Sequence, residues 1–392
     1  MPLTVTLLSL CQALLVSGNI LLIAVSPLIG AELAPGPNWA TAPVAMQWLG
    51  LMCATIPASL IMGRLGRKRG FMLGNLIGLG GVLVAGLALV GEQFGTFMLG
   101  TWLIGIGIGF GMLYRFAAVE AATPELKDRA IGLVMGGGVL AAVLGPWLAR
   151  SSQGLFETPF LGSFLGLGLL YVIALIVLAF TRLPPPQTTH DDGPARPLSE
   201  IVRQPTFIVA ALTGLIGYGV MNLAMTATPL AMHRAGFHFD HVATTIQWHV
   251  LAMFVPAFFT GRLTAYFGAR PMIVVGCLLL AACGLLAQLS VTLYGYYSAL
   301  MLLGLGWNLT FLPATGLLTV TYRTSEKART QATNEFLVFT TVGLTSLLAG
   351  PLEASLGWAG LNAVLLPLAL IPIVALLWQR LANSADSPQI KH

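Results

Sequence analysis

Long apolar runs separated by short polar stretches make up most of the chain. The first four charge-free runs end at Glu32, Arg64, Glu92 and Arg115, and comparable runs continue toward the C-terminus. A helix that spans a bilayer needs about 20 apolar residues. The run from Pro271 to Tyr322 is long enough for two such helices. Together, the runs predict twelve transmembrane helices.

The composition indicates that lipid is the main solvent of this chain. Of its 392 residues, 56% are hydrophobic and only 8% are charged, whereas soluble domains carry about 25% charged residues. The formal net charge of +5 does not indicate nucleic acid as a partner, because basic residues on one side of a membrane protein produce such a total. No basic segment precedes the first apolar run, so we expect a retained helix there and not a cleaved signal peptide.

Lysine and arginine residues fall mainly on one side of the predicted membrane. With the N-terminus inside, sixteen of them lie in cytoplasmic connections or in the C-terminal tail, and only Arg150 and Arg234 lie on the opposite side. Positively charged residues are enriched in cytoplasmic loops. We therefore expect both termini in the cytoplasm and the connection 233–240 outside.

The longest polar stretch runs from Thr181 to Pro205 and is rich in proline. This composition is typical of a flexible linker. It predicts an N-terminal half of six helices (1–181), a cytoplasmic linker (182–204), and a C-terminal half of six helices with a short tail (205–392).

The two predicted halves share short motifs at an offset near 200 residues. The matching segments are Gln47-Trp48 with Gln247-Trp248, the GRL at Gly63 with that at Gly261, the SPL at Ser26 with the TPL at Thr228, and Gly145-Pro146 with Gly350-Pro351. A parallel repeat of six helices is typical of secondary transporters that rock about a site near the bilayer midplane.

Two loop segments resemble a motif of the major facilitator superfamily. They are GRLTAYFGAR, from Gly261 to Arg270, and the shortened GRLGRKRG, from Gly63 to Gly70. Both lack the aspartate of the family motif. The resemblance covers the whole chain and implies an all-α membrane protein with twelve transmembrane helices, the major facilitator fold and two six-helix repeats. One fold serves many substrates, so the fold does not decide the cargo.

Few ionisable residues fall within the predicted spans. No Asp or Glu lies at the centre of a span, and Arg115, Glu120 and Glu335 lie toward cytoplasmic helix ends, where we expect ion pairs or a gating role. No nucleophile and base come together in the sequence. We therefore expect a transporter and not an enzyme.

The seventh and eighth predicted spans contain soft metal ligands. Met221 and Met225 are four residues apart, as are His249 and Met253, so each pair shares one helical face. Thioether sulfur selects soft ions such as Cu(I), and imidazole also suits copper. The alternative is that these methionines fill the apolar core.

Three segments resemble the CcoA-type copper importers of the major facilitator superfamily. They are Trp248 to Leu263, Leu302 to Phe311 and Asn334 to Phe339. The resemblance implies that Met221, Met225, His249 and Met253 bind copper. It also implies a multi-pass protein of the bacterial inner membrane that imports copper, as Cu(I), for assembly of a respiratory haem–copper oxidase.

Copper is then the transported substrate, and no resident cofactor is expected. We further expect a monomer in the lipid bilayer and copper-donating or copper-accepting chaperones as partners. Related proteins of this group carry riboflavin, so transport of riboflavin or another small organic solute is the alternative.

Further candidate residues flank this set. His233, His238 and His241 lie in the predicted external connection and form either a collecting funnel for metal or a polar loop with incidental histidines.

Other candidates come from the repeat and from the fold that the resemblance implies. Cys53 aligns with Met253 in the repeat, and Asn19 aligns with the first methionine of the seventh span. Trp307 and Asn308 lie on the tenth span, which lines the cavity in the major facilitator fold.

Overall fold

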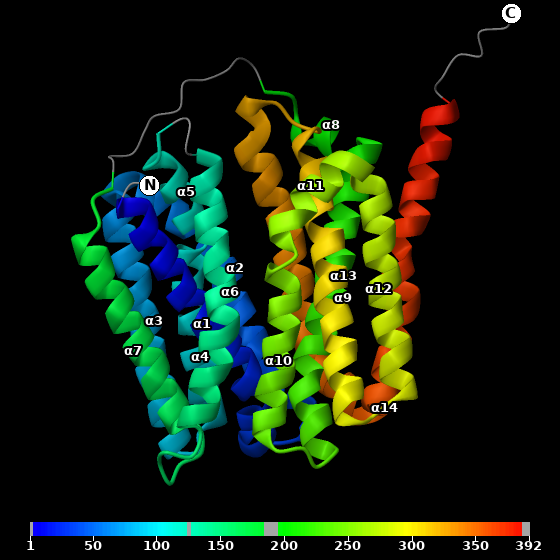
Figure 1. Cartoon of the computed structure of the whole chain (residues 1–392). Coiled ribbons are helices and arrows are strands. Elements are labelled where there is room, and N and C mark those ends of the chain that lie inside the picture. The colour runs from blue at the N-terminus through cyan, green and yellow to red at the C-terminus, as the bar shows by residue number, and fades with distance from the viewer. Residues whose placement is uncertain (1–2, 124–126, 184–194, 386–392) are drawn as a thin grey trace, which may run out of the picture.

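The computed structural model describes residues 3–123, 127–183 and 195–385. Within these ranges all regular elements are helices and no strand occurs, which confirms the expected all-α fold. Figure 1 shows two helical bundles side by side, one made of α1–α7 and the other of α9–α14.

The N-terminal bundle follows the predicted runs closely. Its elements are α1 (Leu3–Leu33), η1 (Pro37–Trp39), α2 (Ala42–Leu65), α3 (Arg67–Val90), α4 (Phe94–Gly111), α5 (Tyr114–Glu120), α6 (Lys127–Ser152) and α7 (Leu161–Phe180).

The second bundle contains two broken helices. Its elements are α8 (Leu198–Val202), α9 (Pro205–Arg234), α10 (Phe239–Phe254), α11 (Ala257–Phe267), α12 (Ala269–Leu289), α13 (Leu293–Thr319), η3 (Thr324–Glu326) and α14 (Lys327–Ala385). The axes of α10 and α11 differ by 40° at the short break between them. The 59-residue α14 is interrupted at Gly357, where φ is +66°, and therefore supplies two spans.

The twelve predicted spans have counterparts in this arrangement. Among the described residues, nine helices are long and apolar enough to cross a membrane, and the bent pair α10 and α11 makes a tenth span. The second limb of α14 adds another, and α6 completes the N-terminal bundle.

Glycines at matching places in the two bundles explain the repeated loop motif. Gly66 joins α2 to α3 with φ +87°, and Gly268 joins α11 to α12 with φ +86°. Such positive φ values strain residues that carry a Cβ atom. The repeat seen in the sequence is thus also present in the backbone.

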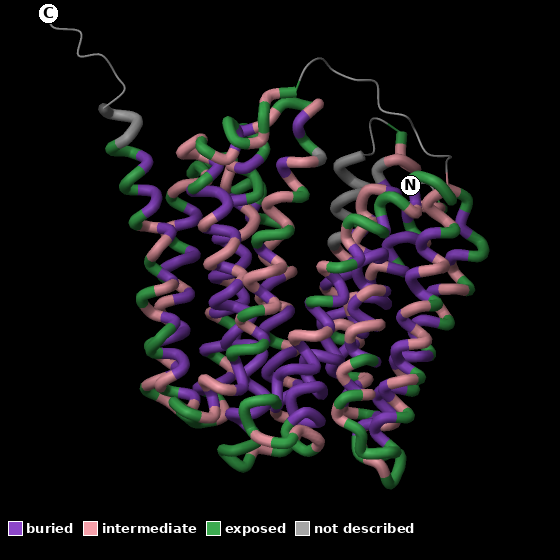
Figure 2. The backbone as a smooth tube through the Cα atoms, turned by 180° about the vertical axis from the view of Figure 1, so that it is seen from behind, coloured by how far each residue is buried: buried purple, intermediate pink, exposed green. Residues whose placement is uncertain are grey.

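The outward faces of the helices carry the apolar side chains expected at a lipid surface. Leu49, Ile56 and Leu60 of α2 are 40–65% exposed, and in water a continuous apolar surface of this kind is rare. Figure 2 shows buried positions along the inner sides of the helices and exposed ones along the outer sides.

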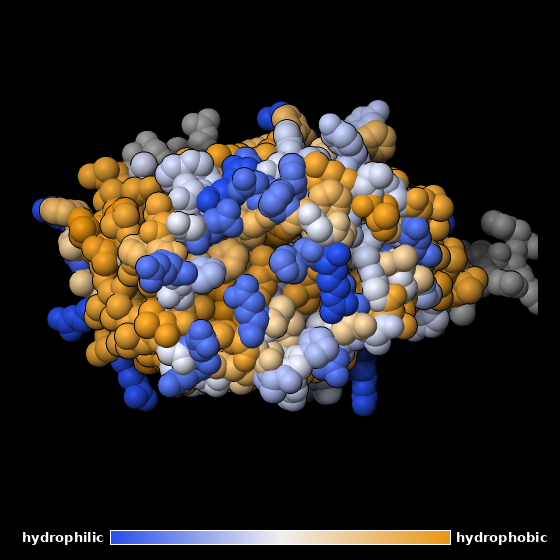
Figure 3. Space-filling model, turned by 90° about the horizontal axis from the view of Figure 1, so that it is seen from below, coloured by the Kyte–Doolittle hydropathy of each residue, from blue (hydrophilic) through white to orange (hydrophobic). Residues whose placement is uncertain are grey.

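The two bundles meet most closely at the end that carries the connection between α9 and α10. Arg150 of α6 donates hydrogen bonds to Thr244 (2.7 Å) and Gln247 (3.2 Å) of α10, and the Gly350 amide of α14 donates to Thr41 Oγ1 (2.9 Å). Figure 3 looks onto this end, where hydrophilic side chains are spread among hydrophobic ones. The start of α1, the end of α7, α8 and the end of α14 lie at the opposite end (Figure 1).

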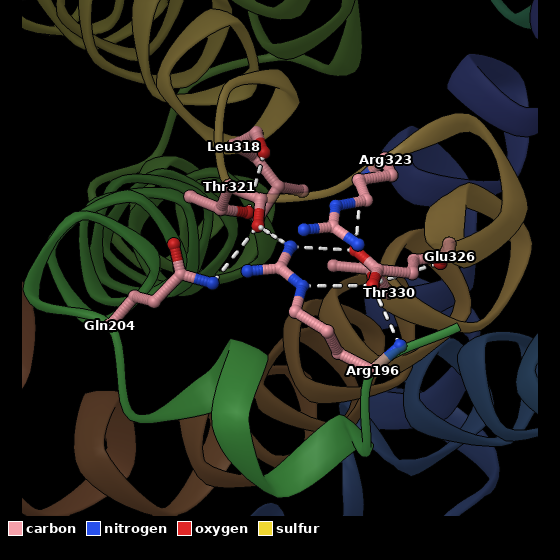
Figure 4. A network of polar contacts seen from close by, with 7 residues as sticks. All are labelled: Arg196, Gln204, Leu318, Thr321, Arg323, Glu326 and Thr330. Atoms are coloured by element: carbon pink, nitrogen blue, oxygen red, sulfur yellow. Dashed lines mark hydrogen bonds and ion pairs between the residues drawn. The ribbon is translucent and has the colours of Figure 1, made fainter. Parts of the chain in front are cut away.

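Hydrogen bonds and an ion pair join the segment before α9 to the connection between α13 and α14 (Figure 4). The buried Glu326 carboxylate accepts hydrogen bonds from the backbone and guanidinium of Arg196 (2.7–2.9 Å) and from the Arg323 amide (2.9 Å). The Arg196 guanidinium holds the pKa of the Glu326 carboxyl well below its usual range. The Thr321 carbonyl accepts hydrogen bonds from Arg196 and Gln204. Much of the predicted linker, residues 184–194, lies outside the described ranges.

Candidate functional site

A central cavity lies between the two bundles. Its volume is about 180 Å³. Its walls come from α1, α2, α4, α5 and α6 on one side and from α9, α10, α13 and α14 on the other. Both bundles therefore contact anything bound there, as alternating access requires.

Aromatic rings from both bundles form much of the cavity wall. Trp48 of α2 stacks on Phe339 of α14, with ring centroids 6.0 Å apart and planes at 20°. Trp307 stacks on Phe311 within α13 at 5.1 Å and 12°. Tyr218 of α9 stands edge-on between these stacks, 6.3 Å from Trp48 and 5.4 Å from Trp307. Rings from both sides of the interface between the bundles thus contact one another at the cavity wall.

Several polar atoms in this wall have no hydrogen-bond partner among the described residues. They include the indole Nε1 atoms of Trp48 and Trp307 and the Oε1 atom of Gln12. Trp48 is 4% exposed and Trp307 is 6% exposed. A buried polar group without a partner costs about 1–3 kcal/mol, and these atoms are themselves buried, so they lie behind the cavity surface and do not donate into it.

An ion pair crosses the cavity between the bundles. The Arg115 guanidinium of α5 lies 2.6 Å from the Glu335 carboxylate of α14, and each side chain is about a third exposed. Both residues line the cavity. Glu120 pairs instead with Arg67 inside the N-terminal bundle, also at 2.6 Å.

The predicted copper ligands occupy buried positions beside the cavity. Met221, Met225 and His249 are 0–4% exposed and are not among the cavity-lining residues, whereas Met253 borders an adjacent pocket together with Trp307. His249 Nδ1 lies 2.8 Å from the Leu300 carbonyl, and His249 Nε2 has no hydrogen-bond partner in the described part of the chain. No cluster of three or more His, Cys, Asp or Glu residues suited to a metal occurs there either. Copper binding by the Met and His set stays a prediction.

The remaining predicted residues divide between the cavity and other places. Asn19 and Trp307 line the cavity. Asn308 is buried, and its side chain bonds to Thr260 and to the Met253 carbonyl, so it braces α13 against the helices α10 and α11. Cys53 is exposed on the lipid-facing side of α2 and does not line the cavity.

Three histidines lie at the end where the two bundles meet most closely: His233 in the last turn of α9, His238 between α9 and α10, and His241 in the first turn of α10. His233 and His238 line a separate pocket of about 590 Å³ there, and His241 Nδ1 is 3.4 Å from the Tyr297 hydroxyl. Their proposed role in collecting metal stays a prediction.

Sequence reasoning missed Tyr218 and used Trp48 only as a landmark of the repeat. The signal that was available is aromatic: Trp48, Tyr218 and Phe339 all fall on spans that line the cavity in this fold. Periodicity within one helix could not show that these rings from three helices meet.

Comparisons with known proteins agree on the family. The profile of the Major Facilitator Superfamily matches residues 8–339. The chain is 38% identical over 378 residues to the riboflavin transporter RfnT of Brucella anthropi, which covers 95% of this chain and 94% of that protein. It is 26% identical to the uncharacterised transporter YddS of Bacillus subtilis, over 93% of this chain and 88% of that one.

Solved structures share the fold at low sequence identity. The human organic anion transporter MFSD10 has a TM-score of 0.70 at 16% identity, covering 96% of this chain and all of that one. A D-xylose–proton symporter has a TM-score of 0.72 at 13% identity, covering 96% of each chain. The resemblance to CcoA-type copper importers is not confirmed by these comparisons. The chain belongs to the major facilitator superfamily of secondary transporters.

Proposed function

We propose that this protein carries riboflavin, or a closely similar flat heteroaromatic solute, across the membrane by alternating access. The observation that carries the proposal is the aromatic wall of the central cavity, to which both bundles contribute rings. Aromatic rings in a cavity wall can pack against the face or the edge of a flat solute.

The similarity to RfnT supports the same choice of substrate, because that protein is a riboflavin transporter and matches nearly the whole chain. Among the described residues that line the cavity, the one acid and the one base, Glu335 and Arg115, pair with each other. A neutral solute is compatible with this balance of charge.

The test is uptake of labelled riboflavin by bacteria that neither make riboflavin nor carry another transporter for it. Cells with this protein should accumulate riboflavin, and Trp48→Ala should reduce uptake about tenfold or more, because it removes a large aromatic ring from the cavity wall. Trp147→Ala is the matched control, since Trp147 is 54% exposed on α6 and lies outside the cavity. Equal uptake by cells with and without the protein would refute the proposal.

Copper import is the second candidate, and one observation favours it. His249 is fully buried on α10, and its Nε2 atom has no partner in the described part of the chain. A soft cation bound by His249 together with methionines of the predicted set would satisfy this nitrogen. Radiolabelled copper uptake, measured in the same cells, separates the two candidates. If copper is the cargo, His249→Ala should abolish copper accumulation. If riboflavin is the cargo, Trp48 should be essential for uptake and His249 should not.

We propose a multi-pass location in a bacterial inner membrane with both termini and the linker in the cytoplasm. The distribution of basic residues supports this orientation, and it makes the described arrangement, closed at the connection between α9 and α10, open toward the cytoplasm. A cysteine introduced at Gly236 should then react with an impermeant reagent from outside. Labelling only after the membrane is permeabilised would show that the protein has the opposite orientation.

A further inference from the structure

Two amide side chains join α1 to α2 at the cavity wall. Asn19 lines the cavity from α1, and Gln47 lies behind it on α2 with 1% of its surface exposed. Gln47 Nε2 donates a hydrogen bond to Asn19 Oδ1. An amide carries an acceptor oxygen on one side and a donor nitrogen on the other. This bond therefore leaves the Asn19 Nδ2 donor for a partner other than Gln47.

Gln47 is held in place by the packing of its backbone. A Cβ atom at Gly105 of α4 would lie 2.0 Å from the Gln47 carbonyl oxygen, so α4 approaches α2 with no side chain between them. The next residue, Trp48, stacks on Phe339 of the other bundle. One short segment of α2 thus supplies both an aromatic face of the cavity and the group that orients Asn19.

The internal repeat places a corresponding pair in the second bundle. Asn19 and Gln47 are 28 residues apart, and Met221 and His249 have the same separation at an offset of 202. A Cβ atom at Gly304 would lie 2.4 Å from the His249 carbonyl oxygen, which repeats the close helix approach of the N-terminal bundle. Met221 and His249 are sealed from the cavity, whereas the N-terminal pair reaches it through Asn19.

We propose that Asn19 contacts the substrate as a hydrogen-bond donor and that Gln47 is the positioning residue that sets this polarity. The inference rests on the proposed transport of a flavin-like solute, whose ring edge is rich in acceptors. The Asn19 Nδ2 donor at the cavity wall would face that acceptor-rich edge.

The decisive variant is Gln47→Glu, which keeps the size of the side chain and removes its donor. An ionised glutamate carboxylate accepts hydrogen bonds only, so it draws Asn19 Nδ2 toward itself and turns Asn19 Oδ1 toward the substrate. Burial favours the neutral acid, which still donates, so the effect should grow as the pH of the assay is raised. We expect the KM for riboflavin uptake to rise about tenfold, with kcat nearly unchanged. Purified Gln47→Glu protein should also quench riboflavin fluorescence at correspondingly higher protein concentrations.

A second variant distinguishes positioning from simple structural support. Gln47→Leu removes the hydrogen bond and leaves Asn19 free to turn, so its KM should rise less than that of Gln47→Glu. A purely structural role predicts that Gln47→Leu is at least as damaging. The matched control is Gln288→Glu on α12, because Gln288 bonds to the Gly284 carbonyl and does not line the cavity.

An unchanged KM in Gln47→Glu, or a larger effect in Gln47→Leu, would overturn this inference and leave riboflavin transport standing. If the wild-type protein neither transports riboflavin nor quenches its fluorescence, both the proposed function and the inference fail.

Discussion

The contact between Gly105 of α4 and the backbone of α2 gives a prediction whose size follows from the structure. In Gly105→Ala the new Cβ atom would begin 2.0 Å from the Gln47 carbonyl oxygen and needs an ordinary contact distance of about 3.4 Å. The helices must therefore separate locally by about 1.4 Å. A backbone oxygen within a helix cannot rotate away, so no side-chain motion relieves the clash.

The expected loss of stability follows from two opposing terms. Overpacking costs about 1–3 kcal/mol, and alanine gains up to about 1 kcal/mol over glycine in helix propensity. The difference between these terms is about 0–2 kcal/mol, and because the clash is with a backbone atom that cannot move away, we expect the upper part of this range, about 1–2 kcal/mol. Because Trp48 follows Gln47, the displacement should also weaken binding of the proposed substrate, riboflavin.

Thermal unfolding in detergent and riboflavin uptake measure these two effects. Gly80→Ala on α3 is the matched control, because a Cβ atom there meets nothing within 4 Å. It should unfold at the wild-type temperature or slightly above it, with normal uptake. The reasoning is wrong if Gly105→Ala unfolds like Gly80→Ala and keeps the wild-type KM.

Two further predictions concern charged pairs. Arg115→Glu places two carboxylates together across the cavity, and it should reduce uptake severalfold while changing thermal stability little, since partly exposed ion pairs contribute about 0–1 kcal/mol. The double variant Arg115→Glu with Glu335→Arg should recover uptake, and a double variant as inactive as the single one would contradict a gating pair. Arg196 lowers the pKa of Glu326 from the usual 4.5. The ionised Glu326 therefore stabilises the folded protein above about pH 4.5, and this stabilisation is lost as the pH falls toward the folded-state pKa. The difference in melting temperature between the wild type and Glu326→Gln should stay constant from pH 7 to 5 and shrink below pH 4.5; a difference that grows on acidification would rule out this linkage.

The sequence by itself determined that most of the chain lies in lipid, how many membrane spans it forms and that its two halves repeat one another. Each of these depends on local information: an apolar run of bilayer length must form a helix because its backbone has no other hydrogen-bond partner in lipid. The loop motifs around Gly66 and Gly268 likewise act locally, through a backbone φ that favours glycine. The sequence could therefore predict these features without knowing how the helices pack.

The choice among candidate site residues depended on packing between helices. Periodicity placed Met221 and Met225 on one face of a helix, but it could not show that this face is buried outside the cavity lining. Repeat alignment placed Cys53 opposite Met253, yet Cys53 is exposed on the lipid-facing side of α2. Small shifts in helix rotation decide which side chain faces the interior, and alignment within one or two residues does not fix that rotation.

Only the tertiary structure brought together the rings of Trp48, Tyr218 and Trp307, which lie far apart in the sequence and come from both bundles. The same holds for the pair of Gln47 with Asn19. Their meeting depends on close approaches between helices, such as that at Gly105, where the absence of a side chain sets the distance. The sequence shows the glycine, but the atom that it makes room for belongs to another helix and is identified only by the fold.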